Sequence, residues 1–363
     1  MTIKSITPVA LNLPFEVGGP KPLFAGKPRN MEMLLVRVET DDGIVGWGEA
    51  FGYAVWPATR TALETLIAPL AAGRDERDIA ALMLDLQRKL HLLGRTGPVM
   101  YAMSGLDIAL WDIAGKAAGK PLAELLGGAK RRDFAAYASL MRYTDPALVA
   151  RNAKAAVERG YRAIKLHETG VEQVRAARAA IGADVKLMMD TNCPWTPAEA
   201  VAIASQVREY DLFWFEEPVW PPEDYAGLAR VRRECGIAVS AGENAVSRAD
   251  FQAMFDAGAV DYAQPSVTKI GGVTEMMRIA RLARERGVTL VPHSPYFGPG
   301  LLATLHMAAS FEHECMIEYS YCDLGANPLG EAIAVNGGRI ALPAGPGLGC
   351  DPDAAVLERY RVA

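Results

Sequence analysis

The feature that most restricts the fold of this chain is a regular alternation of short apolar runs with amphipathic stretches from about residue 133 onward. The apolar runs read AAYASL, AIKLH, VKLMMDTN, LFWFEEP, AVSAGEN, DYAQPSV, VTLVPHS and MIEYS. Strand followed by helix, eight times within about 190 residues, predicts a closed parallel (β/α) barrel. An open doubly wound sheet usually carries a glycine-rich phosphate turn after its first strand, and none follows AAYASL.

The segments that flank this alternation have a different pattern. Residues 1–55 predict antiparallel strands, with a hairpin turning at Asp42 and Gly43, and residues 57–128 predict helices. The tail returns to strand at EAIAVNGGRIALP. We therefore predict an α/β fold with three parts: an α+β capping domain at 1–130, a modified (β/α) TIM barrel at 131–325, and a C-terminal segment at 326–363 that returns to the cap.

Composition excludes several classes of protein. The formal net charge of −5 gives no basic surface for nucleic acid or for an anionic membrane. No apolar run approaches the roughly 18 residues of a transmembrane helix, and the first residues lack the apolar core of a signal peptide. The five cysteines are widely spaced and contain no C-x-x-C pair, so reduced thiols in a cytoplasmic protein are expected.

Polar residues end one predicted strand after another at nearly constant spacing. Steps of 25, 26, 27, 23, 27 and 25 residues join Lys165, Asp190, Glu216, Glu243, Ser266, His293 and Glu318. Each step equals one strand-helix unit, and in a barrel these strand ends meet at one mouth, where barrel enzymes place their chemistry. Three carboxylates meeting there would repel one another unless a cation lies between them. Oxygen ligands in this number suit Mg²⁺, so Asp190, Glu216 and Glu243 are the predicted metal ligands.

The motifs MMDTN, FEEP, AGEN, QPSVTKIGG, VPHS and IEYS, together with SGLDIALWDIAGK, resemble the enolase superfamily, in the branch of mandelate racemase and muconate lactonizing enzyme that includes sugar-acid dehydratases. The resemblance covers nearly the whole chain. It implies Mg²⁺ held by the three acids, removal of the proton α to a substrate carboxylate, and an enediolate stabilised on the metal. It also implies that Glu318 is a hydrogen-bonding group near that carboxylate, and that the enzyme is a homo-oligomer acting on a small-molecule carboxylate.

Two departures from the family pattern bear on the reaction. The second strand reads KLH where Lys-x-Lys is common, and Ser266 stands where many relatives pair the seventh-strand histidine with an aspartate. Lys165 and His167 lie two apart on a strand and so point into the barrel together. We expect Lys165 to stay cationic, a neutral His167 to accept the α-proton, and His293 to assist the leaving hydroxyl.

Three reactions remain open at this point. A racemase needs competent bases on both faces of the carbanion, whereas a dehydratase needs one base and one acid. The two departures therefore favour dehydration of a hydroxy or sugar acid over racemisation or epimerisation of a hydroxy acid or amino-acid derivative. A relative that binds metal without catalysis is the third alternative.

Substrate contacts are expected partly from the capping domain. Residues 14–30 are rich in glycine, proline and lysine and suit a lid over the mouth, or a solvated loop. Tyr53 and Trp56 are candidate pocket walls, and Asn192 and Ser266 are candidate substrate contacts from the barrel. The structural alternatives are a helix-capping Asp190, a hydrogen-bonded turn at His293, a structural His167, and a swapped ligand role for Glu217, which neighbours Glu216. Lys269 is expected to face the barrel exterior or to pair with an acid.

Overall fold

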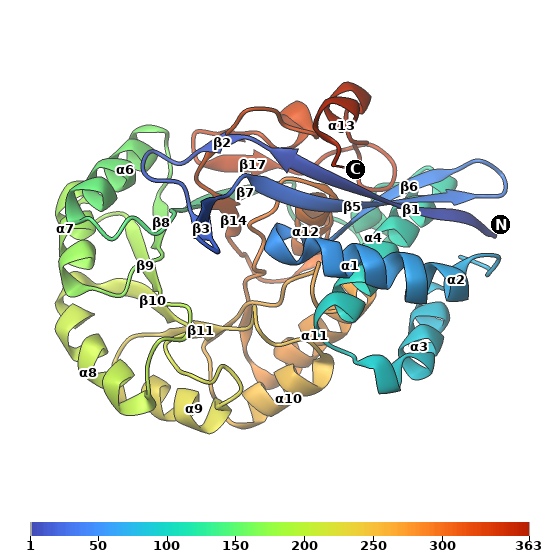
Figure 1. Ribbon diagram of the computed structural model, residues 1–363. Helices are drawn as coiled ribbons and strands as arrows, with labels where there is room; N and C mark the ends of the chain where they lie inside the picture. The colour runs from blue at the N-terminus through green and yellow to red at the C-terminus, as the bar shows by residue number, and fades with distance from the viewer. Residues whose placement is uncertain (1, 363) are drawn as a thin grey trace.

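Residues 2–362 are described by a computed structural model, in which eight parallel strands form a barrel (Figure 1). The strands are β7 (Asp133–Ser139), β8 (Ala163–Leu166), β9 (Lys186–Asp190), β10 (Leu212–Glu216), β11 (Val239–Ala241), β12 (Tyr262–Ala263), β13 (Thr289–Leu290) and β14 (Ile317–Ser320). The ladders run in chain order from β7 to β13, and β14 pairs with β7 on its other side. This arrangement confirms the predicted α/β barrel.

Helices cover the outside of the barrel, as Figure 1 shows. They are α6 (Pro146–Glu158), α7 (Val171–Ile181), α8 (Pro197–Val207), α9 (Tyr225–Glu234), α10 (Arg248–Asp256), α11 (Gly272–Arg286) and α12 (Pro299–Ser310). The prediction of eight strand-helix units was wrong in its last unit. β14 leads into the short strand β15 (Asp323–Leu324), which pairs with β2 (Phe15–Glu16) near the start of the chain.

The capping domain combines an antiparallel sheet with helices. Its strands β1 (Ile3–Leu13), β5 (Met31–Thr40) and β6 (Val45–Ala50) pair in the order β1-β5-β6. The long helix α4 (Gly97–Ala118) packs closely on β6. Gly48 permits this approach, because a Cβ at this position would overlap the carbonyl oxygen of Gly105. The remaining cap helices are α1 (Trp56–Ala62), α2 (Ala68–Ala71), α3 (Ile79–Lys89) and α5 (Leu122–Leu125).

Helix α4 also docks the cap on the barrel. Its Ser104 Oγ accepts a hydrogen bond from Gly271 N at 2.8 Å, and its Asp107 Oδ1 accepts one from Thr274 N at 3.0 Å. Both donors lie at the N-terminus of α11, where backbone N–H groups lack partners within the helix. Ser104 and Asp107 are three residues apart and therefore share one face of α4. The motif SGLDIALWDIAGK thus has a structural role in joining the two domains.

The buried carboxyl of Glu49, in β6, makes a second joint between cap and barrel. Its Oε2 accepts a hydrogen bond from Gly300 N, in the first turn of α12, at 2.9 Å. Burial raises the pKa of Glu49 from its usual 4.5 to about 8, against the effect of that hydrogen bond. The acid is therefore favoured in its neutral form in the folded protein at neutral pH.

Glu49→Gln is expected to raise the melting temperature at pH 8 and to change it little at pH 5. In the unfolded chain Glu49 ionises near pH 4.5, whereas in the folded chain it ionises only near pH 8. Stability is therefore lost as the pH rises between these values, by up to about 1.4 kcal/mol per pH unit. Glutamine is neutral throughout and escapes this loss. Calorimetry of both proteins from pH 5 to 8 checks the result, and a pH-independent difference would contradict it.

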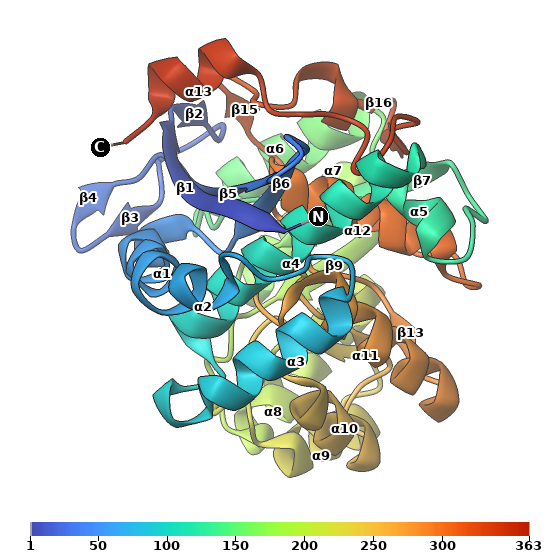
Figure 2. The same ribbon diagram turned by 90° about the vertical axis from the view of Figure 1, so that its right-hand side faces the viewer.

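The tail lies along both domains, and Figure 2 shows it beside the first strands of the cap. Short strands β16 (Val335–Asn336) and β17 (Arg339–Ala341) form a hairpin whose β17 pairs with β7. Helix α13 (Ala354–Tyr360) follows, and Arg361 bridges Leu11 of β1. A small hairpin of β3 (Leu23–Phe24) and β4 (Lys27–Pro28) lies within the predicted lid. The exact domain boundaries stay a prediction. Among residues 2–362, no helix is long and apolar enough to cross a membrane.

Candidate active site

Four side chains form a buried charged group where the barrel strands end; this Lys165 cluster consists of Lys165, Asp190, Glu216 and Glu318. Lys165 Nζ lies 3.2 Å from Asp190 Oδ2 and 2.8 Å from both Glu216 Oε1 and Glu318 Oε1. None of the four side chains is more than 1% exposed. The strand register brings them together, since Glu216 is directly opposite Asp190 in the β9–β10 ladder.

Burial opposes the charged forms in this cluster, and the ion pairs decide the outcome at each group. The surrounding carboxylates outweigh burial at Lys165 and raise its pKa well above the usual value. The charges of Lys165 and His167 likewise outweigh burial at Asp190 and hold its pKa below the usual range. At Glu216 burial prevails over the attraction of Lys165 and raises the pKa to about 8. The cluster therefore holds more carboxyl groups than its own cation can keep ionised.

Glu243 follows β11 and faces the seventh strand rather than the Lys165 cluster. Its Oε2 lies 2.5 Å from His293 Nε2, and its backbone carbonyl accepts a hydrogen bond from Lys269 Nζ at 3.0 Å. Burial opposes ionisation of Glu243, but the charges of His293 and Lys269 outweigh it and hold the pKa well below the usual value. Because a carboxylate only accepts hydrogen bonds, His293 Nε2 carries a hydrogen in this contact.

His167 lies directly after β8, with its ring 24% exposed at the barrel mouth. Its Nδ1 donates to the Leu140 carbonyl oxygen at 2.5 Å, which leaves Nε2 to face Asp190 Oδ2 at 3.3 Å. Burial lowers the pKa of His167, but Asp190 outweighs burial and the net shift is upward. The neighbouring Asp190 charge therefore makes His167 a stronger proton acceptor, and the neutral imidazole expected from the sequence stays a prediction.

Ser266 is fully buried beside His293 and is not part of the cavity wall, and its substrate contact stays a prediction. Its Oγ lies 3.2 Å from His293 Nδ1 and also contacts the Tyr296 hydroxyl. A pair of neutral hydroxyl groups therefore orients this histidine, in place of the carboxylate described above for the family. The only sign in the sequence that Tyr296 lies near the site is its position three residues after His293.

A cavity of about 750 Å³ opens above these groups, between the strand ends and the cap. Its wall includes His167, Glu243, His293, Glu318 and, as predicted, Tyr53 and Asn192. Trp56 is not part of the wall. It lies in α1 and packs on the core of the cap, so its prediction as a pocket wall was wrong.

The cavity wall also contains two cations that the sequence analysis did not assign to the site, Arg142 and Lys269. Lys269 is only 6% exposed, and its Nζ lies 4.4 Å from the centre of the Phe51 ring. It therefore reaches into the barrel mouth, and the expectation that it faces the barrel exterior was wrong. The predicted lid contributes Lys21, Pro22, Leu23 and Arg29.

Glu217 adopts a left-handed backbone conformation, with φ of 46°. Its Oε2 accepts a hydrogen bond from Asn244 Nδ2 at 2.8 Å and lies 3.6 Å from Cys193 Sγ. Burial, reinforced by the charge of Glu243, raises the pKa of Glu217 well above its usual value. These contacts give Glu217 a structural environment of its own beside Glu216.

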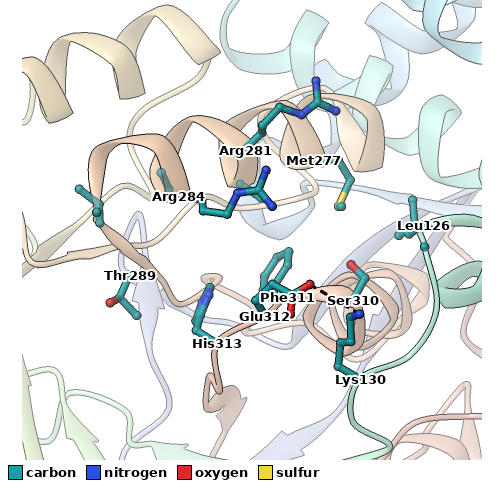
Figure 3. Close-up of a pocket in the computed structure, with 15 residues that line it drawn as sticks. Leu126, Lys130, Met277, Arg281, Arg284, Thr289, Ser310, Phe311, Glu312 and His313 are labelled. Atoms are coloured by element: carbon teal, nitrogen blue, oxygen red, sulfur yellow. Dashed lines mark ion pairs between the residues drawn. The ribbon is translucent and has the colours of Figure 1, made fainter.

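A second cavity, of about 480 Å³, lies at the opposite end of the barrel (Figure 3). Lys130 precedes β7 and Thr289 begins β13, so this cavity is at the N-terminal ends of the strands. Its wall contains one carboxylate, Glu312, and His313 Nε2 is engaged with the Leu290 carbonyl at 2.8 Å. Barrel enzymes place their chemistry at the other end, where the buried ion pairs of Lys165 lie in this protein.

The donors at the barrel mouth fit a hard divalent cation in chemistry, although their side chains are held apart here. Within residues 2–362, no three of the His, Cys, Asp and Glu side chains are arranged to hold a metal ion. Lys165 occupies the space between Asp190 and Glu216, and His293 engages Glu243. Oxygen ligands of this type suit Mg²⁺, and the raised pKa of Glu216 shows an uncompensated demand for positive charge.

Comparisons with known proteins agree with this geometry. Residues 148–356 match the family model described as Enolase C-terminal domain-like, and residues 18–127 match the model of the mandelate racemase / muconate lactonizing enzyme N-terminal domain. Arabinonate dehydratase of Saccharolobus solfataricus is 33% identical over 342 residues, covering 91% of each chain. D-galactarolactone cycloisomerase of Agrobacterium fabrum is 35% identical over 352 residues, again covering 91% of each.

Solved structures give the same result. A racemase from Streptomyces coelicolor A3(2) with bound magnesium superposes with a TM-score of 0.89 at 29% identity, covering 99% of this chain and 100% of the other. Both domains are thus accounted for by one family. The chain belongs to the mandelate racemase and muconate lactonizing enzyme family of the enolase superfamily.

Proposed function

We propose that this protein is a hydro-lyase that dehydrates a sugar acid with the help of Mg²⁺. The observation that carries the proposal is the Lys165 cluster, flanked at one cavity by His167 on β8 and His293 after β13. The relationship to arabinonate dehydratase supports the same reaction class.

The reaction requires two bonds to break on adjacent carbons. The bond between the α-carbon and its hydrogen breaks first and leaves an enediolate, and the β-carbon then loses its hydroxyl as water. The resulting enol becomes a 2-keto-3-deoxy acid. A proton α to a carboxylate is weakly acidic, so preorganised positive charge must stabilise the developing oxyanion. When bound by Asp190, Glu216 and Glu243, Mg²⁺ supplies that charge.

The side chains of this protein then bind the substrate and transfer the protons. Lys165, held cationic by its carboxylates, stabilises negative charge at the substrate carboxylate. His167 accepts the α-proton at Nε2, because its Nδ1 already donates to Leu140. His293 donates a proton from Nε2 to the departing hydroxyl. Glu318 lines the cavity from β14 and contacts the substrate carboxylate end.

A second reaction uses the same elimination. If the leaving oxygen belongs to a ring of the substrate, the elimination opens the ring and no water is released. The relationship to D-galactarolactone cycloisomerase favours this as the second candidate. Racemisation fits less well, because His293 Nδ1 lies against Ser266 Oγ, a neutral hydroxyl, where a carboxylate would orient the second base of a racemase.

The test is a screen of sugar acids with Mg²⁺ in D₂O, followed by NMR and mass spectrometry. Dehydration gives a 2-keto-3-deoxy product with the mass of the substrate less water, whereas ring opening keeps the mass unchanged. Exchange of the α-proton with formation of the C2 epimer indicates an epimerase. Mg²⁺ binding without any exchange indicates the non-catalytic relative. The cytoplasmic location and the homo-oligomeric state stay predictions, and light scattering measures the latter.

A further inference from the structure

Arg142, three residues after β7, places a guanidinium group at the edge of the cavity. Its Nε donates to the His167 carbonyl oxygen at 2.7 Å, and its Nη2 donates to Asn192 Oδ1 at 2.9 Å. Both acceptors are neutral, so they fix the guanidinium in place without neutralising its charge. Arginine stays protonated in proteins, and the charge is therefore permanent.

The other edge cations of this cavity have acidic partners. Lys21 Nζ lies 3.3 Å from Glu16 Oε1, and Arg29 Nη2 lies 2.9 Å from Glu32 Oε2. Within the part of the chain that the structure describes, no acidic oxygen lies within 4.0 Å of the Arg142 guanidinium. Arg142 is thus preorganised and still uncompensated.

Glu168 is the acid that lies near enough to respond to Arg142, and other groups engage it. Its Oε1 accepts from the backbone N–H of Tyr143 at 2.7 Å and from that of Thr144 at 3.1 Å. These bonds hold the Glu168 carboxylate against the backbone of the loop that follows β7. The Arg142 Nη1 group makes no hydrogen bond among residues 2–362 and is available to a ligand.

The depth and the edge of the cavity therefore carry charges of opposite sign. Its depth contains the acids of the Lys165 cluster with Glu243, which serve the reacting carboxylate end of a substrate. Its edge presents Arg142 together with Asn192, whose Oδ1 accepts from Arg142 and whose amide hydrogens remain as further donors. With Mg²⁺ bound by those acids, a linear ligand with one anionic group at each end would meet positive charge at both regions.

We propose that Arg142 and Asn192 form a subsite for a second anionic group, at the end of the substrate remote from the reacting carboxylate. The inference rests on the proposed sugar-acid function and narrows its substrate class to acid sugars with an anionic group at each end, called dianions below for these two groups. Two sources share this chemistry: an aldaric acid, with a carboxylate at each end, and an aldonic acid that carries a terminal phosphate. Guanidinium binds both groups through paired N–H donors.

The experiment compares matched substrates in the wild-type enzyme and in Arg142→Gln. The panel consists of aldonates, the aldarates of the same configuration, and the corresponding terminal phosphates, each assayed with Mg²⁺ for kcat/KM. Dianionic members are expected to be preferred by the wild type. Arg142→Gln is expected to lower their kcat/KM about tenfold to a hundredfold more than that of the aldonates, as loss of a charge-assisted hydrogen bond implies.

Lys21→Gln is the matched control, because it removes a cation at the same cavity edge that already has an acidic partner. It should leave the preference for dianions over aldonates unchanged. Arg142 also holds the backbone of His167, so an equal loss for all substrates in Arg142→Gln would show a positioning role and overturn the subsite. The better of the two dianion types identifies the terminal group.

Binding measured by calorimetry with Mg²⁺ separates this inference from the proposed reaction. Dianions that bind more weakly to Arg142→Gln than to the wild type, yet never exchange an α-proton, would support the subsite and overturn the dehydratase. Turnover of aldonates in preference to every dianion, unaffected by Arg142→Gln, would support the dehydratase and overturn the subsite.

Discussion

Glu243→Gln is expected to lower turnover about a thousandfold or more while the barrel stays folded. Glu243 supplies one of the three carboxylates proposed to bind Mg²⁺, and its side chain now contacts His293 rather than Lys165. Glutamine keeps the size of the side chain but removes the charge that attracts a divalent cation. Calorimetric titration with Mg²⁺ should show weaker binding, and circular dichroism should show unchanged secondary structure.

Glu217→Gln provides the matched control for this result. Glu217 is buried beside the same site, but its side-chain contacts are with Asn244 and Cys193. Glutamine preserves the acceptor for Asn244, so Mg²⁺ binding and turnover should change little. Wild-type activity that survives treatment with a chelator and removal of metal, or full turnover in Glu243→Gln, would rule out the proposed role of the metal.

The two histidine variants are expected to separate proton abstraction from loss of the hydroxyl. His167→Asn should lose both dehydration and α-proton exchange in D₂O, by about a hundredfold or more, since the accepting nitrogen is removed. His293→Asn should lose dehydration by a similar factor and keep part of the exchange, because the enediolate can still form. NMR of the substrate α-position and assay of the keto product measure the two steps separately.

The reverse pattern in these variants would exchange the roles of the two histidines. If His293→Asn instead loses exchange for one substrate stereoisomer only, the enzyme is an epimerase and the dehydration proposal fails. Glu314→Gln serves as a background substitution, because this exposed residue lies before β14, at the N-terminal end of the barrel away from the mouth.

The sequence predicted the barrel and the strand-end acids because both follow from spacing. A strand-helix unit has a nearly fixed length, so polar residues at a constant interval must meet at one end of the barrel. The spacing predicted that Asp190, Glu216 and Glu243 meet at one mouth. Asp190 and Glu216 meet at Lys165 there, whereas the side chain of Glu243 engages His293. The missing eighth helix escaped prediction because the segment after β14 pairs with β2, a partner some three hundred residues distant in the chain.

The spacing of residues in the sequence could not predict the direction in which loop side chains point. Arg142 lies past the end of β7, where alternation no longer fixes the face, and its role depends on acceptors contributed by two other strands. Trp56 was misplaced for the same reason, since the residues after β6 turn into α1 and direct its ring to the cap core. Ser266 lies on the expected strand end, but Tyr296 engages its hydroxyl and His293 lies beside it.

The ladder between β2 and β15 limits how this enzyme could be re-engineered. Strand β2 opens the segment that carries the β3–β4 hairpin over the cavity, while β15 directly follows the strand that bears Glu318. Phe15 pairs with Leu324 and Glu16 with Asp323, so the two segments form one unit. A chimera that takes only residues 14–30 from a relative would present mismatched edges to β15. Exchange of substrate preference between relatives therefore requires transplanting residues 14–30 and 321–325 as a single cassette.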